Sequence, residues 1–148
     1  MAVADPAHVE AVLRPTGFFR QKAKHAIESA RLLVERHGGE VPRTVEALTA
    51  LPGVARKTAN VVLGTAFGIQ EGVTVDTHVF RVTGRWGWHR EKQPAKVERL
   101  LMERVPRPGW SDFGHRAVLF GRYTCTARAP KCDGCLLAGV CPSAVATQ

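Results

Sequence analysis

The sequence has no run of about 18 apolar residues, the length at which a membrane-spanning helix becomes a candidate. Residues 1–5 carry neither the basic segment nor the apolar segment of a secretory signal. No alternation of apolar and polar residues indicates a strand, and the chain has neither an internal repeat nor a low-complexity tract. We therefore expect an all-α protein that stays inside the cell, in the cytoplasm, and does not bind a membrane.

Acidic residues are in the minority. There are 13 Asp and Glu against 21 Lys and Arg, which gives a formal net charge of +8 and a pI near 9.9. Basic side chains gain affinity for phosphates by releasing condensed counterions, so nucleic acid is the favoured partner. Charge alone does not decide this, because a solvated basic face would give the same composition.

Cysteine is absent outside one short stretch, Cys125-x6-Cys132-x2-Cys135-x5-Cys141. Disulfides are uncommon inside cells, so the four thiols are interpreted as ligands of a metal centre. Structural zinc sites usually pair two short C-x2-4-C hooks, but only the middle interval is that short here. The wider outer intervals favour a four-iron cluster, with zinc as the alternative.

Two cations lie inside the first cysteine interval, Arg128 and Lys131. An ordered cluster loop could present them to DNA phosphates. Alternatively, they only balance the charge of the cluster.

The length of 148 residues suits one globular domain, or two small lobes that share a core. Apolar spacing and capping signals predict a series of helices with short connections. The first is expected over residues 21–37, and a short second helix is expected after a cap at Thr44. A third would run from Arg56 to Gly68, and a fourth from a cap at Asp76 through Val82. The last two would run from Pro94 to Val105 and from a cap at Asp112 to about Gly121.

A tight turn, Leu51-Pro-Gly-Val-Ala55, separates two of these helices. Small residues at Gly53 and Ala55 would let the backbone approach a ligand, and the next helix offers its unpaired N–H groups to a phosphate. This arrangement would bind the DNA backbone independently of the base sequence. A Pro-Gly turn between helices is more often only a helical corner, so the surrounding pattern must decide.

Lys57 and Asp76 are the candidate catalytic residues. Lys57 falls in the first turn of a predicted helix, where the macrodipole disfavours its charge, and partial burial would act in the same direction. A neutral amine near an acidic partner could attack the anomeric carbon of a nucleoside and expel the base. The simpler interpretations are a surface lysine for Lys57 and a helix N-cap for Asp76. Asp76 could serve both as the helix N-cap and as the catalytic carboxylate.

Four features occur together in order, and together they resemble the endonuclease III family of helix-hairpin-helix DNA glycosylases over nearly all of the chain. They are Leu51-Pro-Gly-Val-Ala-Arg-Lys-Thr-Ala-Asn60, Val75-Asp-Thr-His-Val-Phe-Arg-Val82, Gly121-Arg-Tyr-Thr-Cys125 and the cysteine spacing. The resemblance implies a base-excision repair enzyme that removes oxidised pyrimidines, such as thymine glycol, and then cleaves the abasic site by β-elimination.

The resemblance also implies a role for each site residue. Lys57 would be the Schiff-base nucleophile and Asp76 the catalytic carboxylate. The related adenine glycosylase lacks a lysine at this position, which favours the bifunctional enzyme. A four-iron four-sulfur cluster would be held by Cys125, Cys132, Cys135 and Cys141.

The resemblance implies DNA-binding residues as well, because such an enzyme flips the damaged nucleotide out of the duplex and must bind the phosphates of the DNA backbone. The residues expected to bind DNA are Gly53, Val54, Ala55, Arg56, Thr58, His78, Arg128 and Lys131.

The implied fold is the helix-hairpin-helix glycosylase fold with a C-terminal cluster loop. Residues 1–121 would form a helical region, with the hairpin unit at about 44–68 and a catalytic segment at 75–82, and residues 122–148 would form the loop. The partner would be double-stranded DNA with damaged bases or abasic sites, met at the nucleoid, and the protein would be a monomer if the chain is complete.

The sequence departs from the family at two places. Ala55 stands where the family has a second hairpin glycine. The first helices of the family, including a glutamine-bearing segment that fills the gap left by the flipped base, have no counterpart, so we expect an N-terminally truncated version of the fold.

Two other functions fit parts of the pattern. One is a non-catalytic iron–sulfur module that binds DNA, or an inactive fragment of such an enzyme, and the other is a zinc-stabilised helical adaptor. The presence of both Lys57 and Asp76 favours the enzyme, because binding alone requires neither.

Overall fold

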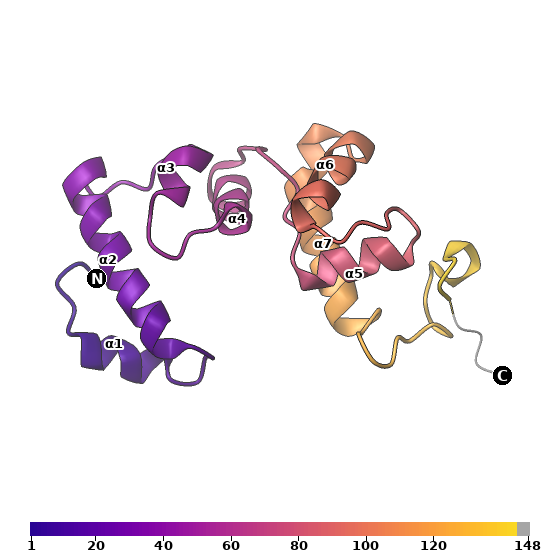
Figure 1. Ribbon diagram of the computed structural model, residues 1–148, viewed down its shortest axis with the longest axis horizontal. Coiled ribbons are helices and arrows are strands. Elements are labelled where there is room, and N and C mark those ends of the chain that lie inside the picture. The colour runs from indigo at the N-terminus through magenta and orange to yellow at the C-terminus, as the bar shows by residue number, and fades with distance from the viewer. Residues whose placement is uncertain (145–148) are drawn as a thin grey trace. The chain divides into compact units, whose positions relative to one another are not determined.

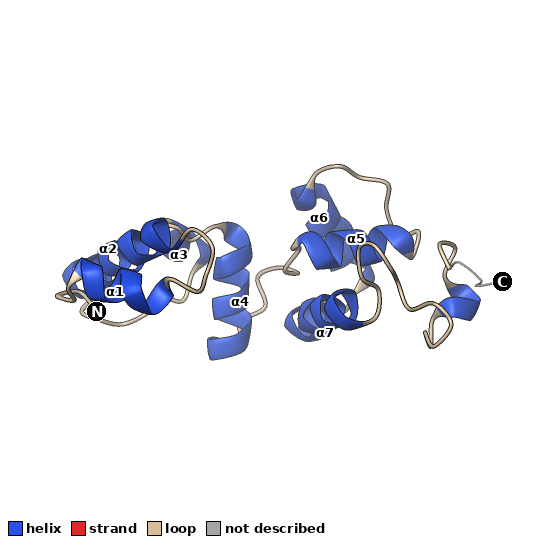
Figure 2. Cartoon of the chain, turned by 90° about the horizontal axis from the view of Figure 1, so that it is seen from below, coloured by secondary structure: helices blue, strands red, loops and turns tan. Residues whose placement is uncertain are grey.

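A computed structural model describes residues 1–144, so the last four residues of the predicted cluster loop lie outside the described residues. The described chain is helical and has no strand, as Figure 2 shows, which confirms the all-α prediction. It divides into two compact units, Met1–Ala59 and a second unit that starts at Asn60. The elements labelled in Figure 1 are α1 Pro6–Leu13, α2 Phe19–His37, α3 Val45–Thr49, α4 Arg56–Phe67, α5 Thr77–Arg85, α6 Pro94–Arg104 and α7 Trp110–Tyr123. Two 3-10 turns are η1 Arg107–Gly109 and η2 Ala138–Val140.

The first unit begins with helix α1, which the sequence analysis did not predict. The side chain of Asp5 caps it by accepting from the N–H groups of Ala7 and His8, at 3.4 and 3.1 Å. Pro6 occupies its first turn, where proline needs no hydrogen-bond donor. The helix packs on α2 through the small cluster of Val9, Ala23 and Ile27.

Helices α2 and α3 follow their sequence signals closely. Helix α2 ends at Gly38, whose φ of 60° is the left-handed conformation that glycine adopts at low cost. Thr44 caps α3, because its Oγ1 accepts from the N–H of Ala47 at 3.2 Å. Among the described residues, no helix is both long and apolar enough to cross a bilayer.

The second unit holds the larger core. Helices α5 and α7 contact each other, and α6 contributes its buried stripe. The core residues are Val73, Val75, Val79, Val97, Leu101, Trp110 and Ala117. Val97 and Leu101 of α6 are buried and lie four residues apart, on one face of the helix that Pro94 starts.

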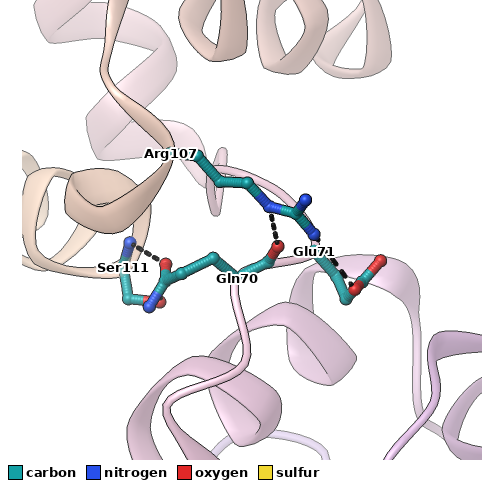
Figure 3. Close-up of polar contacts among 4 residues, drawn as sticks. All are labelled: Gln70, Glu71, Arg107 and Ser111. Atoms are coloured by element: carbon teal, nitrogen blue, oxygen red, sulfur yellow. Dashed lines mark hydrogen bonds and ion pairs between the residues drawn. The ribbon is translucent and has the colours of Figure 1, made fainter.

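The start of α7 corrects the prediction that Asp112 caps this helix. The helix begins at Trp110, and Asp112 lies in its first turn, where it pairs with Arg116 at 2.8 Å. The cap comes from a distant residue instead: Gln70 Oε1 accepts from the backbone N–H and the hydroxyl of Ser111, both at 2.9 Å (Figure 3). A distant side chain thus satisfies a donor of the first turn, which the local sequence did not show.

Gly121 on α7 is buried against α5. A Cβ added at Gly121 would lie 2.9 Å from His78 Cβ and 3.0 Å from Val82 Cγ2. Both contacts are with atoms held by α5, so they have little freedom to move aside.

We predict that Gly121→Ala lowers the stability of the protein by about 1–3 kcal/mol, because the added methyl group forces α5 and α7 apart. The loss would occur although alanine favours a helix by about 1 kcal/mol over glycine. Thermal unfolding followed by circular dichroism measures it. Gly17→Ala is the control, since nothing lies within 4 Å of a Cβ there. A Gly121→Ala protein as stable as the control would show that this contact is not tight.

Candidate active site and metal centre

The hairpin of the first unit is held in one conformation by Gly53. Its φ of 76° is left-handed, and a Cβ at this position would overlap Nδ1 of His25 on α2. The hydroxyl of Ser29, also on α2, donates to the carbonyl of Pro52 at 3.0 Å. Both the backbone angle and the packing therefore require glycine at position 53. Helix α2 supports the turn through His25 and Ser29.

Ala55, which replaces a glycine of the family pattern, fits the hairpin without strain. Phe18 is the only non-glycine residue with positive φ in the described chain, so Ala55 adopts an ordinary backbone conformation. Its carbonyl accepts from the N–H groups of Thr58 and Ala59, at 2.8 and 3.0 Å, and so starts α4. A helix N-terminus carries the positive end of the helix dipole, which makes this end of α4 suited to an anion.

Lys57 lies in the first turn of α4 and is exposed. The partial burial considered from the sequence is not observed. Val54 and Thr58 are half-buried, whereas Gly53, Ala55 and Arg56 are exposed. Lys57 belongs to the first compact unit and Asp76 to the second.

Asp76 caps α5, as predicted, and it uses one oxygen to do so. Oδ1 accepts from the N–H groups of His78 and Val79, both at 2.8 Å. Within the described residues, the other oxygen, Oδ2, has no hydrogen-bond partner. The cap therefore fixes the carboxylate in place and leaves one oxygen available for a positive charge on a substrate.

His78 and Arg81 connect the start of α5 to the end of α7. Arg81 Nη2 donates to the carbonyl of Gly121 at 2.7 Å and to that of Cys125 at 3.1 Å, and it lies 3.3 Å from His78 Nδ1. His78 is half-buried in this arrangement.

The four cysteines are all free, partly buried, and line a single pocket. Trp86 and Phe120 form part of the apolar wall of this pocket, and Arg85 and Lys131 contribute cations. Lys131 and Arg128 are both exposed, as presentation to a phosphate would require.

Arg85, on the last turn of α5, holds the first cysteine directly. Its Nη1 donates to Cys125 Sγ at 3.3 Å and to the carbonyl of Thr126 at 2.6 Å, and Nη2 donates to the carbonyl of Ala127 at 2.8 Å. A guanidinium beside a thiolate offsets negative charge, and hydrogen bonds to cluster sulfurs help to set a cluster's reduction potential.

The donor set fits a cluster held by four cysteines, because four thiols surround one pocket and a cation lies against one of them. Within the described part of the chain, no three of His, Cys, Asp or Glu are arranged to hold a single metal ion. The assignment of the cluster therefore rests on this pocket and on the comparison with known families.

Two family models match the chain. Residues 1–107 match the HhH-GPD superfamily of base excision DNA repair proteins, and residues 125–141 match the iron–sulfur binding domain of endonuclease III. The all-helical fold, the hairpin and the cysteine pocket thus define a helix-hairpin-helix protein with an iron–sulfur segment. The match confirms the predicted four-iron four-sulfur cofactor and disfavours zinc.

Comparison with individual known proteins identifies the family within this class. The chain is 49% identical over 147 residues to endonuclease III of Synechocystis sp. and 45% identical over 133 residues to that of Escherichia coli K12. It also superposes with a TM-score of 0.90 and 40% identity on a solved structure of a non-covalent endonuclease III–DNA complex, covering 97% of this chain. The chain belongs to the endonuclease III family, as its motifs predicted.

The chain is shorter than these relatives. It spans 67% of the length of the Synechocystis protein, 63% of the Escherichia coli protein and 67% of the solved chain, while 99%, 90% and 97% of its own residues are matched.

Sequence reasoning missed the contacts of Arg81 and Arg85. Both lie on α5 one turn apart, and they donate to residues of the cluster segment that lie 40 to 44 positions later in the chain. Two arginines four residues apart, placed after an N-capping aspartate, were the only local signal.

We predict that the protein purified without air contains about four irons and four sulfides per chain, as a four-cysteine cluster requires. Cys135→Ser should lose most of this iron, because a serine hydroxyl is a poor ligand for it. Iron and acid-labile sulfide analysis measure both. Ser143→Ala, which alters the same pocket without removing a thiol, is the control. A colourless protein with bound zinc would refute the assignment.

Proposed function

We propose that this chain is a base-excision repair DNA glycosylase that removes oxidised pyrimidines and cleaves the resulting abasic site by β-elimination. Membership of the endonuclease III family supports the proposal, and so does the presence of both an amine and a carboxylate at the expected positions. The observation that carries it is the exposed amine of Lys57, which directly follows the hairpin on the first turn of α4.

The chemistry assigned to Lys57 is nucleophilic. Acting as the free amine, Nζ attacks C1′ of the damaged nucleoside, the glycosidic bond breaks, and the electron pair and a proton leave with the base. The sugar ring then opens to an imine with Lys57. Loss of a proton from C2′ moves an electron pair toward the imine and expels the 3′ phosphate, which completes β-elimination.

Asp76 is assigned the electrostatic role. Positive charge develops on the sugar as the base departs, and a fixed carboxylate stabilises such charge without having to reorganise. The cap on Oδ1 supplies the fixed position, and Oδ2 is the oxygen that would face the sugar.

DNA binding is assigned to two surfaces. The hairpin, residues 53–56 with Thr58, would bind phosphates through the backbone and the helix N-terminus. Arg128 and Lys131 would add charge from the cluster segment, and His78 would lie near the carboxylate. When bound, the cluster would supply a covalent framework for this segment, held by the four cysteines.

Solved relatives support the partner. One is described as a non-covalent endonuclease III–DNA complex and another as a trapped covalent endonuclease III–DNA intermediate. By analogy, the partner of this chain would be duplex DNA carrying a damaged base or an abasic site, met at the nucleoid in the cytoplasm. One chain per lesion, acting as a monomer, is sufficient for the assigned chemistry.

We predict that borohydride traps this protein on DNA containing an abasic site and that Lys57→Gln forms no trapped product, because an amide cannot form the imine. Lys92→Ala, which removes an exposed lysine outside the site, should be trapped as efficiently as the unmodified protein. Denaturing gel electrophoresis measures the adduct. Equal trapping of Lys57→Gln would refute the assigned nucleophile, and no trapping of any variant would favour the non-catalytic DNA-binding module.

We predict that Asp76→Asn keeps the stability of the protein but lowers base removal roughly hundredfold or more, because the amide oxygen can still cap α5 while the negative charge is lost. Asp76→Ala should lose both the activity and about 1 kcal/mol of stability. Single-turnover cleavage of thymine glycol DNA and thermal unfolding separate the two effects. An active Asp76→Asn protein would show that the carboxylate is only a cap.

A further inference from the structure

Residues 68–75 connect α4 to Asp76, and Gln70 anchors this linker at its start. Gln70 Oε1 accepts two hydrogen bonds from Ser111, one from the backbone N–H and one from the hydroxyl, each at 2.9 Å (Figure 3). Both residues are half-buried. A single side-chain oxygen therefore joins the linker to the first turn of α7.

Arg107 of η1 forms a second connection at the same place. Its Nε donates to the carbonyl of Gln70 at 3.1 Å, and its Nη2 lies 3.6 Å from Glu71 Oε1 (Figure 3). The guanidinium also lies 5.7 Å from the centre of the Trp110 ring, which belongs to the core. The backbone and the side chain of Gln70 are thus both tied to the η1–α7 corner.

Most of the linker after Glu71 is buried. Gly72 is buried, and a Cβ there would overlap the hydrogen-bonded pair of Asn60 Nδ2 and Glu98 Oε1, which are 2.9 Å apart. Val73 and Val75 are core residues. Because Gly72, Val73 and Val75 are buried, the segment has little slack, and an anchor at Gln70 would influence the direction from which the chain enters Asp76.

We propose that Gln70 is a positioning residue for Asp76: by tying the linker to the start of α7, it fixes where the carboxylate lies. The proposal rests on the assigned function of Asp76, whose cap on α5 fixes it from the C-terminal side, while the buried Val75 and the Gln70 anchor hold the chain that enters it from the other side. Small displacements of a catalytic group are costly, since about 1 Å can lower a rate by 10²-fold.

Gly64 provides an independent way to break the same anchor. It lies on α4, and a Cβ at this position would overlap Ser111 Oγ and displace the hydroxyl from Gln70. Gly64→Ala and Gln70→Ala therefore disturb one contact from opposite sides. If the contact carries the effect, the double variant should be no worse than the more impaired single variant.

The experiment compares Gln70→Ala with Gln70→Glu on abasic-site DNA under single-turnover conditions. We expect Gln70→Ala to lower the maximal rate roughly tenfold with little change in the DNA concentration needed for half-saturation. Gln70→Glu keeps an acceptor oxygen and places negative charge at a helix N-terminus, so it should stay within about twofold of the unmodified rate. Gln93→Ala, at an exposed glutamine with no side-chain cap bond, is the control.

Amide hydrogen exchange gives a readout that does not depend on activity. The N–H groups of His78 and Val79 report the Asp76 cap, and both should exchange faster in Gln70→Ala but not in Gln70→Glu. Unchanged exchange at these amides in Gln70→Ala, or equal losses in both variants, would overturn the proposal. Faster exchange in a protein that borohydride never traps would instead refute the assigned function and leave the positioning role standing.

Discussion

The cap that Asp76 places on α5 is the interaction on which the candidate site depends. One oxygen holds two backbone N–H groups at 2.8 Å, and this fixes both the start of the helix and the position of the carboxylate. The same helix carries Arg81 and Arg85, which reach the cysteine segment through four hydrogen bonds to carbonyls and one to Cys125 Sγ. Helix α5 therefore joins the carboxylate at its beginning to the cluster ligands near its end.

This arrangement gives the cluster segment a physical role. A loop with four thiolates and little regular structure has few ways to define its own conformation, and the cluster would tie its ligands together. The two arginines satisfy carbonyls of the loop and place positive charge beside the first thiol. Arg128 and Lys131 then lie on a segment whose first residues are held by α5. A fixed position of this kind would help the two cations to bind a phosphate backbone.

Features that local chemistry decides were predicted from the sequence. Thr44, Asp76 and Pro94 start their helices because capping and proline geometry act within one turn, and the cysteine spacing was sufficient to indicate a metal centre. Asp112 was wrongly predicted as a cap because α7 begins two residues earlier, at Trp110, where Gln70, 41 residues away from Ser111, accepts from the Ser111 N–H. The arginine contacts of α5 and the support of the hairpin by His25 and Ser29 also join residues distant in sequence, and no local pattern shows them. Helix α1 is different. Asp5 and Pro6 are a local signal for a helix start, yet no helix was predicted before residue 21.

The central claim is that Lys57 is the residue that bonds to the sugar. The most direct measurement is peptide mapping by mass spectrometry of the unmodified protein after borohydride trapping on DNA with an abasic site. The account predicts that the sugar remnant is attached to the peptide that contains Lys57. Attachment to another lysine, such as Lys131 of the cluster segment, would contradict it.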